Sequence, residues 1–441
     1  MSALAELFVR RGVKVTGCDA NATGVDDLRK LGVSIEQGHD PSHVAKARAL
    51  VVTSAMPKDH PELERARSQG IPVIRRAEAL GEATSGGGRD LIGIAGTHGK
   101  STTTVMTAEA LAAADRNPTA LVGARVAQWG GNLRAGGDQV YVVEADEYDR
   151  SFLTLSPTVA VVTNVEADHL DIYDDLADIR RAFTDFIRDA RTTVLCGDDT
   201  GASTLPTPSA TEVIRYGIAS PDARLRALNV RNDSSGAAFG VEYDGELLGS
   251  VALRVAGTHN VLNALAAIGA GLSIGAPFAG LAYGLANFAG AARRFERLGD
   301  AGGVTIVDDY AHHPTEISAT LAAARAMFPG RRLVIAFQPH LYSRTRDFAG
   351  DFARALCAGD AVYLTEIYAA REKPIPGVTA DLIVSAFGAG ERRKLSWRGD
   401  RTALAEALAA GVRDGDVVIT MGAGDITKTG PELLARLRRA A

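Results

Sequence analysis

The segment GIAGTHGKST, Gly93 to Thr102, combines glycines, a lysine and hydroxyl side chains between an apolar run and a helical pattern. Unpaired N–H groups at the start of a helix favour anions, and Lys100 can reach the β and γ phosphates of a nucleotide. Ser101 can ligate Mg²⁺. The common pattern G-x-x-x-x-G-K-[ST] would require glycine at Ile94. The segment therefore predicts an ATP-binding loop of different spacing, with a plain glycine turn before a buried helix as the alternative.

Acidic side chains follow two of the apolar runs that come after this loop. Ligands of open α/β sheets bind outside the carboxyl ends of the strands, which is where such side chains would meet a magnesium-bound triphosphate. A single cluster of this kind is more often a solvated strand end, but two in one domain favour a Mg²⁺ site. The residues are Glu144, Asp146 and Glu147 in YVVEADEYD, and Glu166, Asp168, His169 and Asp171 in VVTNVEADHLDIY.

The elements that must position these residues alternate between strand and helix patterns along the chain. This alternation predicts an α/β fold of parallel sheets covered by helices. A length of 441 residues suits roughly three domains of about 150 residues each. The glycine-rich SGGGRD marks the first boundary, and Asp244-Gly245 predicts an antiparallel hairpin. We expect domains at residues 1–86, 87–297 and 298–441.

Composition excludes several other classes of protein. A net charge of −5 without a long basic run argues against nucleic-acid binding. There is no apolar stretch of membrane-spanning length and no signal-peptide pattern at the start, so we expect a cytoplasmic protein without a membrane span. The three cysteines, Cys18, Cys196 and Cys357, are far apart and form no C-x-x-C pair. Their spacing indicates neither a disulfide framework nor a zinc site.

Several segments together resemble one family, the Mur ligases of bacterial cell-wall synthesis, which form amide bonds at the expense of ATP. GTHGKSTTT is similar to the family's phosphate loop, EADHLD to its magnesium-binding segment, and GTHNVLNALAA to the element whose asparagines approach adenine. DDYAHHPTEI and FQPHLYSRTRDF resemble the signatures of the alanine-adding members. Some sister enzymes use a modified lysine beyond the Asp-His segment, and this chain has no lysine between Lys100 and Lys373. That absence also fits the alanine-adding members.

The resemblance implies a Rossmann-like UDP-sugar domain, a central P-loop ATPase domain and a Rossmann-like carboxy-terminal domain. It implies that ATP and Mg²⁺ are used to join L-alanine to UDP-N-acetylmuramate through an acyl phosphate, with release of ADP and phosphate. Two alternatives stay open. One is a recycling ligase of the same family that adds a murein tripeptide, and the other is a noncatalytic P-loop nucleotide-binding protein. The sequence predicts no oligomeric state.

The same resemblance implies roles for particular residues. Helix capping is the ordinary alternative for Asn260 and Asn263, and strand-end polarity for His312. The implied catalytic residues are Lys100, His169, His312 and Arg344, and the Mg²⁺ ligands are Ser101, Glu144 and His169. The implied nucleotide contacts are Gly96, Thr97, His98, Gly99, Lys100, Ser101, Thr102, Asn260, Asn263, Arg294 and Asp309. For the substrates we expect His340 and Arg344, with Asp19 and Ser54 remaining for uridine.

The amino terminus departs from the family pattern. Members open with a strand and a glycine-rich loop, G-x-G-G-x-G-M-S, which binds the UDP pyrophosphate, whereas this sequence begins at Met1-Ser2-Ala3-Leu4, as if inside that motif. We therefore expect the first domain to lack its first strand and loop. A start codon placed too late is the favoured explanation, ahead of a truncation or an altered domain, because a parallel sheet stripped of a buried strand exposes unpaired backbone.

Overall fold

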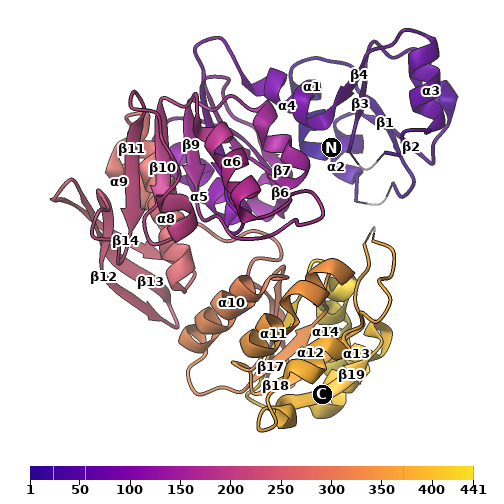
Figure 1. Cartoon of the computed structure of the whole chain (residues 1–441), viewed down its shortest axis with the longest axis vertical. Helices are drawn as coiled ribbons and strands as arrows, with labels where there is room; N and C mark the ends of the chain where they lie inside the picture. The colour runs from indigo at the N-terminus through magenta and orange to yellow at the C-terminus, as the bar shows by residue number, and fades with distance from the viewer. Residues whose placement is uncertain (23, 55, 371, 441) are drawn as a thin grey trace. The chain divides into compact units, whose positions relative to one another are not determined.

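The computed structural model describes residues 1–22, 24–54, 56–370 and 372–440 (Figure 1). The chain divides into two compact units, each a mixed α/β structure, so the predicted fold class is confirmed. The predicted domain boundaries at residues 86 and 297 stay predictions. The first unit comprises Met1–Arg226, Glu242–Gly249 and Asn263–Leu285, and the second comprises Ala227–Val241, Ser250–Leu262 and Ala286–Ala441.

The beginning of the first unit contains four short strands and the helices between them. The sequence predicts one parallel sheet here, but in the described residues β1 pairs in parallel with β2, and β3 separately with β4. Each strand has only three or four residues, so each ladder is short. The elements are α1 (Ser2–Arg10), β1 (Thr16–Asp19), α2 (Asp26–Lys30), β2 (Ser34–Gln37), η1 (Pro41–Val44), β3 (Leu50–Val52), α3 (Pro61–Ser68), β4 (Val73–Arg75) and α4 (Arg76–Thr84).

A larger sheet follows, in which β5 lies between β8 and β9 and is parallel to both. β5, β8 and β9 are apolar runs buried on both faces, as the sequence predicts, and α5 packs against β6 and β8. These strands form part of a ten-stranded sheet and have the order β11-β10-β9-β5-β8-β6-β7 within it. The elements are β5 (Asp90–Ala95), α5 (Lys100–Ala113), β6 (Thr119–Val126), η2 (Ala127–Trp129), β7 (Gly131–Arg134), β8 (Val140–Glu144), η3 (Tyr148–Thr154), β9 (Val159–Val162), α6 (Leu176–Ile187), β10 (Thr192–Cys196), α7 (Thr200–Ser203) and β11 (Glu212–Gly217).

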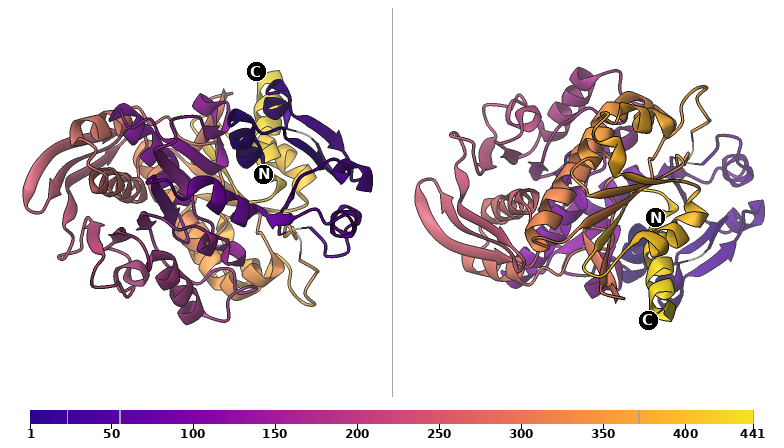
Figure 2. Two further views of the ribbon diagram at one scale, coloured as in Figure 1. Left: turned by 90° about the horizontal axis from the view of Figure 1, so that it is seen from above. Right: turned by 90° about the horizontal axis from the view of Figure 1, so that it is seen from below.

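The predicted hairpin at Asp244-Gly245 is confirmed. Both residues have positive φ, 50° and 84°, which suits the tight turns that join antiparallel strands. Figure 2 shows the hairpin and its neighbours in two further views, and the division between the units passes through these strands and through α8. The elements are β12 (Leu225–Asp233), β13 (Gly236–Tyr243), β14 (Glu246–Leu253), α8 (Thr258–Ser273) and α9 (Phe278–Ala286).

The second unit contains a six-stranded sheet of order β15-β16-β20-β17-β18-β19. All its pairs are parallel except β15 with β16, an antiparallel edge that the sequence pattern did not predict. Alternate residues of the strands meet α10, α11 and α12 on one face and α13 and α14 on the other. The elements are β15 (Glu296–Ala301), β16 (Val304–Asp309), α10 (Pro314–Met327), β17 (Leu333–Phe337), α11 (Tyr342–Leu356), β18 (Ala361–Thr365), α12 (Asp381–Ala386), η4 (Arg392–Lys394), β19 (Leu395–Gly399), α13 (Arg401–Gly411), β20 (Val417–Met421), η5 (Asp425–Lys428) and α14 (Thr429–Ala440).

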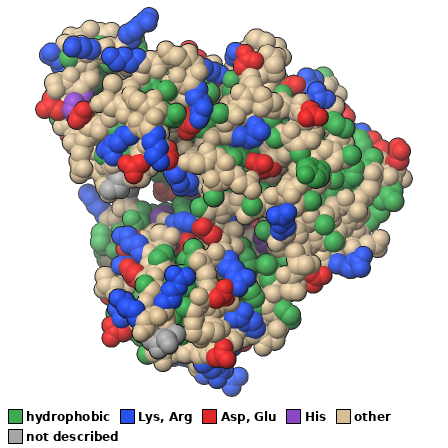
Figure 3. All heavy atoms as spheres, turned by 180° about the vertical axis from the view of Figure 1, so that it is seen from behind, with side chains coloured by type: hydrophobic (Ala, Val, Ile, Leu, Met, Phe, Trp, Pro, Cys, Tyr) green, Lys and Arg blue, Asp and Glu red, His purple; other side chains and the backbone are tan. Residues whose placement is uncertain are grey.

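Charges of both signs are mixed on the face of the molecule that Figure 3 shows. On the face drawn in Figure 3, basic and acidic side chains alternate over the surface without gathering into one basic patch. Within the described ranges, every helix is too short or too polar to cross a membrane.

Candidate functional site

The predicted phosphate loop connects β5 to α5 at the carboxyl end of the central sheet. Gly99, with φ 83°, caps α5 at Lys100, and Gly96 has φ 138°. A Cβ at Gly96 would collide with Thr163 Oγ1, and one at Gly99 would lie 2.7 Å from Asn263 Oδ1. Only glycine fits these positions, because backbone conformation and lack of space act together.

The loop is held against the end of β9. The Thr97 N–H donates to the Asn164 carbonyl over 3.1 Å, and the His98 N–H donates to Asn164 Oδ1 over 2.7 Å. Thr163 Oγ1 donates to the His98 carbonyl over 2.6 Å. The sequence pattern assigned no role to Asn164 or Thr163, although both stand at the end of a predicted strand. They fix the shape of the loop, and Thr102 follows buried in the first turn of α5.

The Lys100 ammonium lies inside the loop. It donates to the carbonyls of Gly96 and Thr97 over 2.6 and 3.1 Å, and its Nζ lies 2.8 Å from a Glu147 carboxylate oxygen. Burial alone would lower the lysine pKa, but the carboxylates of Glu147 and Asp146 outweigh it and raise that pKa. The side chain is therefore a fixed cation at the start of α5, as an anion site needs.

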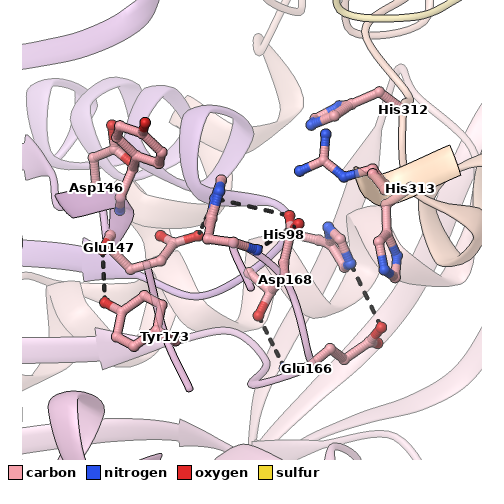
Figure 4. Close-up of polar contacts among 12 residues, drawn as sticks. His98, Asp146, Glu147, Glu166, Asp168, Tyr173, His312 and His313 are labelled. Atoms are coloured by element: carbon pink, nitrogen blue, oxygen red, sulfur yellow. Dashed lines mark hydrogen bonds and ion pairs between the residues drawn. The ribbon is translucent and has the colours of Figure 1, made fainter. Parts of the chain in front are cut away.

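The sequence places Glu147 among the candidate Mg²⁺ residues, but it does not predict that Glu147 pairs with Lys100. Its Oε1 lies 3.6 Å from His169 Nε2, and its carbonyl accepts from the Tyr173 hydroxyl over 2.7 Å (Figure 4). Burial by itself raises the Glu147 pKa, but the Lys100 ammonium brings it below its usual value. Burial likewise opposes the charged form of His169, yet the hydrogen bond to Glu147 raises its pKa. His169 therefore belongs to the same buried charge cluster as Lys100.

Two of the predicted Mg²⁺ ligands are in contact. Ser101 Oγ donates to Glu144 Oε1 over 2.9 Å, and Glu144 Oε2 accepts from the Gly123 N–H over 2.6 Å. A hydroxyl and a carboxylate offer the oxygen ligands that Mg²⁺ prefers. The donor set fits that ion, with Ser101 and Glu144 as the residues that could hold it beside the phosphate loop.

Asn260 and Asn263 both lie in α8 and are buried. Asn260 Nδ2 donates to the Ala256 carbonyl over 2.8 Å, which is a local hydrogen bond at the N-terminus of α8. Asn263 Oδ1 accepts from Thr103 Oγ1 over 3.1 Å and so joins α8 to the helix that follows the phosphate loop. Their predicted contact with adenine stays a prediction.

In the second unit, His312, His340 and Arg344 come together. The rings of His312 and His340 meet edge to face with centroids 5.8 Å apart. Arg344 Nη1 lies 3.3 Å from His340 Nδ1, and its side chain is buried at the start of α11. His340 also stacks on Tyr368. The three residues implied for the amino-acid side of the reaction thus form one cluster, and their contacts with substrate stay predictions.

Arg294 and Asp309 are held by protein groups in this structure. The Arg294 guanidinium lies 4.7 Å from the centre of the Tyr310 ring. Asp309 accepts the N–H groups of Phe295 and Ala311 over 2.7 and 2.8 Å. Burial raises the Asp309 pKa to about 6 against the opposing charge of Arg294. Asp309 therefore ties β16 to the segment before β15, and its predicted contact with ribose remains to be tested.

The two candidate uridine residues lie on separate strand pairs. Asp19 ends β1 and accepts the Asn21 N–H over 2.9 Å. Ser54 is exposed just after β3. No hydrogen bond joins them in the part of the chain that the structure describes, so it does not bring them into one group.

Comparison with protein-family models finds three consecutive matches. Residues 1–87 match the model described as "Mur ligase family, catalytic domain". Residues 94–271 match the "Mur ligase middle domain". Residues 293–424 match the "Mur ligase, glutamate ligase domain".

Curated relatives are similar over nearly the whole chain. The UDP-N-acetylmuramate--L-alanine ligase of Acidothermus cellulolyticus is 45% identical, with 100% of this chain and 93% of that protein covered. The enzyme of the same name from Oleidesulfovibrio alaskensis is also 45% identical, over 98% of this chain and 95% of its own length.

Solved structures give a similar result. The UDP-N-acetylmuramate-alanine ligase of Thermotoga maritima is 28% identical and matches with a TM-score of 0.85, covering 100% of this chain and 97% of its own. A murein peptide ligase from Psychrobacter arcticus is 25% identical and has a TM-score of 0.73, covering 99% of this chain and 96% of its own.

Proposed function

The chain belongs to the Mur ligase family, and from that premise we propose that it joins L-alanine to UDP-N-acetylmuramate with cleavage of ATP to ADP and phosphate. It has the family's three-part α/β architecture. The observation that carries the proposal is the 45% identity, over 98–100% of this chain, to relatives that bear the name of this reaction.

The chemistry explains why ATP is needed. A carboxylate reacts poorly with an amine because its oxygen is a poor leaving group. In the proposed reaction a carboxylate oxygen of UDP-N-acetylmuramate bonds to the γ-phosphorus of ATP, and the bond from that phosphorus to ADP breaks. The alanine nitrogen then attacks the acyl carbon, phosphate leaves with its bridging oxygen, and the nitrogen loses a proton. Positioning and charge neutralisation carry most of such a reaction.

Lys100 is suited to hold the β and γ phosphates. Its ammonium is buried, charged and already paired with an anion, the Glu147 carboxylate. Phosphate oxygens arriving at the N-terminus of α5 would share that cation, and the helix start would favour them further. We propose that Ser101 and Glu144 hold Mg²⁺, which when bound supplies positive charge to the triphosphate.

Arg344 is proposed to bind the alanine carboxylate or the transferred phosphoryl group. A guanidinium presents two parallel donors to such planar or tetrahedral oxyanions, and here His340 and the start of α11 fix its position. His312 is proposed to lie near the attacking amine, since its ring meets that of His340. A cytoplasmic location is part of the proposal because ATP and the nucleotide-linked sugar are substrates.

The second candidate is a murein peptide ligase, favoured by the 0.73 TM-score to the enzyme of that name. The two differ in the amino component. The decisive measurement is ADP release with UDP-N-acetylmuramate and, in turn, L-alanine, glycine, L-serine and the tripeptide L-alanyl-γ-D-glutamyl-diaminopimelate. Turnover with L-alanine supports our proposal. Turnover with the tripeptide alone would establish the second candidate instead.

A further inference from the structure

A second cluster of ionisable side chains lies in the first unit, near the start of the chain. Cys18 is in β1, His39 follows β2, and Glu62 is in the first turn of α3. His43 and His60 lie beside them. The reaction proposed above uses none of these residues.

Glu62 is the centre of this cluster and is 1% exposed. The Cys18 thiol donates to Glu62 Oε1 over 3.0 Å, and His43 Nδ1 lies 3.0 Å from the same oxygen. His39 Nδ1 lies 3.6 Å from Glu62 Oε2. The carboxylate also accepts the Asp40 N–H over 3.2 Å. The ion pairs of Glu62 in the described ranges are all with histidines and none is with lysine or arginine. A buried carboxylate is costly unless a positive charge accompanies it.

The geometry of three ligand atoms suits a tetrahedral metal ion. Cys18 Sγ and His39 Nδ1 are 3.5 Å apart, and the sulfur, that nitrogen and a Glu62 oxygen all lie within 4.8 Å of one another. Zinc–ligand bonds of 2.0–2.3 Å place neighbouring ligands of a tetrahedron about 3.3–3.8 Å apart. The protein therefore holds these three atoms at nearly the spacing that zinc requires.

The chemistry of the donors selects among divalent ions. Thiolate and imidazole ligands suit Zn²⁺, whereas Mg²⁺ takes oxygen ligands. Burial and the Glu62 carboxylate raise the pKa of the Cys18 thiol to about 12, so without a cation it stays protonated. A bound zinc ion would displace that proton, since a coordinating thiol is deprotonated.

We propose that Cys18, His39 and Glu62 bind a Zn²⁺ ion, with His43 orienting the Glu62 carboxylate. On binding, the Cys18 S–H bond breaks, a sulfur–zinc bond forms, and the proton goes to solvent. The chain supplies three ligands in this proposal, and the side chain of one of them, His39, is 32% exposed.

The ion would join the two halves of this part of the unit. Cys18 belongs to the β1–β2 pair, whereas Glu62 belongs to α3, which lies between β3 and β4 in the chain. The two pairs share no ladder in the described residues. A zinc ion would cross-link residues 18 and 62, and an ion that binds the folded state stabilises it.

The test uses the full chain, freed of metal with a chelator and titrated with Co²⁺ as a spectroscopic probe in excess Mg²⁺. We expect one Co²⁺ per chain with the visible bands of tetrahedral cobalt and a thiolate charge-transfer band, both removed by Zn²⁺. Cys18→Ser should abolish the charge-transfer band. The matched control, Cys357→Ser, removes a half-buried thiol of the second unit and should leave the band unchanged.

A second variant guards against misfolding of the first. His39→Gln changes a partly exposed side chain and should lower Zn²⁺ affinity at least tenfold with an unchanged circular dichroism spectrum. His43→Gln should lower it less, since it acts through Glu62. A wild-type protein without the thiolate band, or a band that survives Cys18→Ser, would overturn the proposal. Neither readout depends on ligase activity, so this result is separate from the test of the proposed function.

Discussion

Glu147 and Glu62 are buried carboxylates of the same unit, but the charge that accompanies each is different. Glu147 has the ammonium of Lys100 at 2.8 Å, at the end of a strand beside the phosphate loop. Among the described residues, Glu62 is surrounded by a thiol, imidazoles and a backbone N–H. The cluster around Glu147 contains the Lys100 ammonium and is therefore suited to bind an anion such as phosphate. The described residues around Glu62 supply a thiol and imidazoles, so that cluster is suited to bind a metal cation.

The largest expected effect concerns the built-in cation. Lys100→Ala should lower L-alanine-dependent ADP release by at least about 10³-fold, because the substitution removes the charge that meets the β and γ phosphates. Binding of UDP-N-acetylmuramate, measured by calorimetry, should stay almost unchanged. Lys428→Ala, which changes an exposed lysine of the second unit, is the matched control. Retained turnover in Lys100→Ala would refute the assignment of this loop to ATP.

Removing the Glu147 carboxylate should lower the free energy of unfolding more than removing the Glu62 carboxylate. Glu147→Gln removes the carboxylate that contacts the buried Lys100 ammonium and should destabilise the nucleotide-free protein by about 3–5 kcal/mol. In the part of the chain that the structure describes, Glu62 pairs only with histidines, so Glu62→Gln in chelated protein should cost about 1 kcal/mol. Hydrogen exchange of the amides in α5 and α3 would measure the two regions separately. Equal losses of stability in Glu147→Gln and Glu62→Gln would contradict the proposed difference between the two sites.

Zinc affinity should rise with pH. Because the Cys18 thiol keeps its proton until a cation binds, each bound zinc ion should release one proton, and affinity should increase about tenfold per pH unit near neutrality. Titration in buffers of different ionisation enthalpy gives the number of protons released. A pH-independent affinity in the wild type would mean that the thiol is not a ligand.

The phosphate-loop cluster should respond to pH in the opposite direction, with the smallest effect. Glu147 raises the pKa of His169 above its unfolded value, so this stabilisation is present in full below the unfolded pKa and is lost as pH rises through the folded one. Unfolding of nucleotide-free protein should therefore become easier above about pH 6.5. This dependence of the free energy of unfolding on pH should disappear in His169→Gln. A persistent slope would assign the effect to another group.

The sequence predicts a site well when the residues of that site are neighbours in the chain, and poorly when they are far apart. The phosphate loop is contiguous, so glycine turn, lysine and helix start could be identified together, and buried strands such as β5 were visible as apolar runs. The pairing of Glu147 with Lys100 could not be predicted, because Glu144, Asp146 and Glu147 lie close together in the chain and only the fold shows which one meets Lys100.

The cysteine spacing indicated no zinc site, because that rule looks for pairs of cysteines. Here one cysteine meets a histidine and a glutamate that lie 21 and 44 positions further along the chain. Neither β15 nor the separation of β1–β2 from β3–β4 follows from local pattern, since pairing partners are chosen by packing between distant segments.

The packing of α1 has a consequence for synthesis on the ribosome. Leu4 and Leu7 of this helix are buried, α1 packs against β7, and Ser2 Oγ donates to Asn132 Oδ1 over 3.1 Å, 130 positions away. At about 5–20 residues per second, translation needs on the order of ten seconds to make that partner after α1 has appeared. During this interval the side of α1 that packs on β7 is uncovered, so nascent chains that end before Gly131 expose this apolar surface to chaperones.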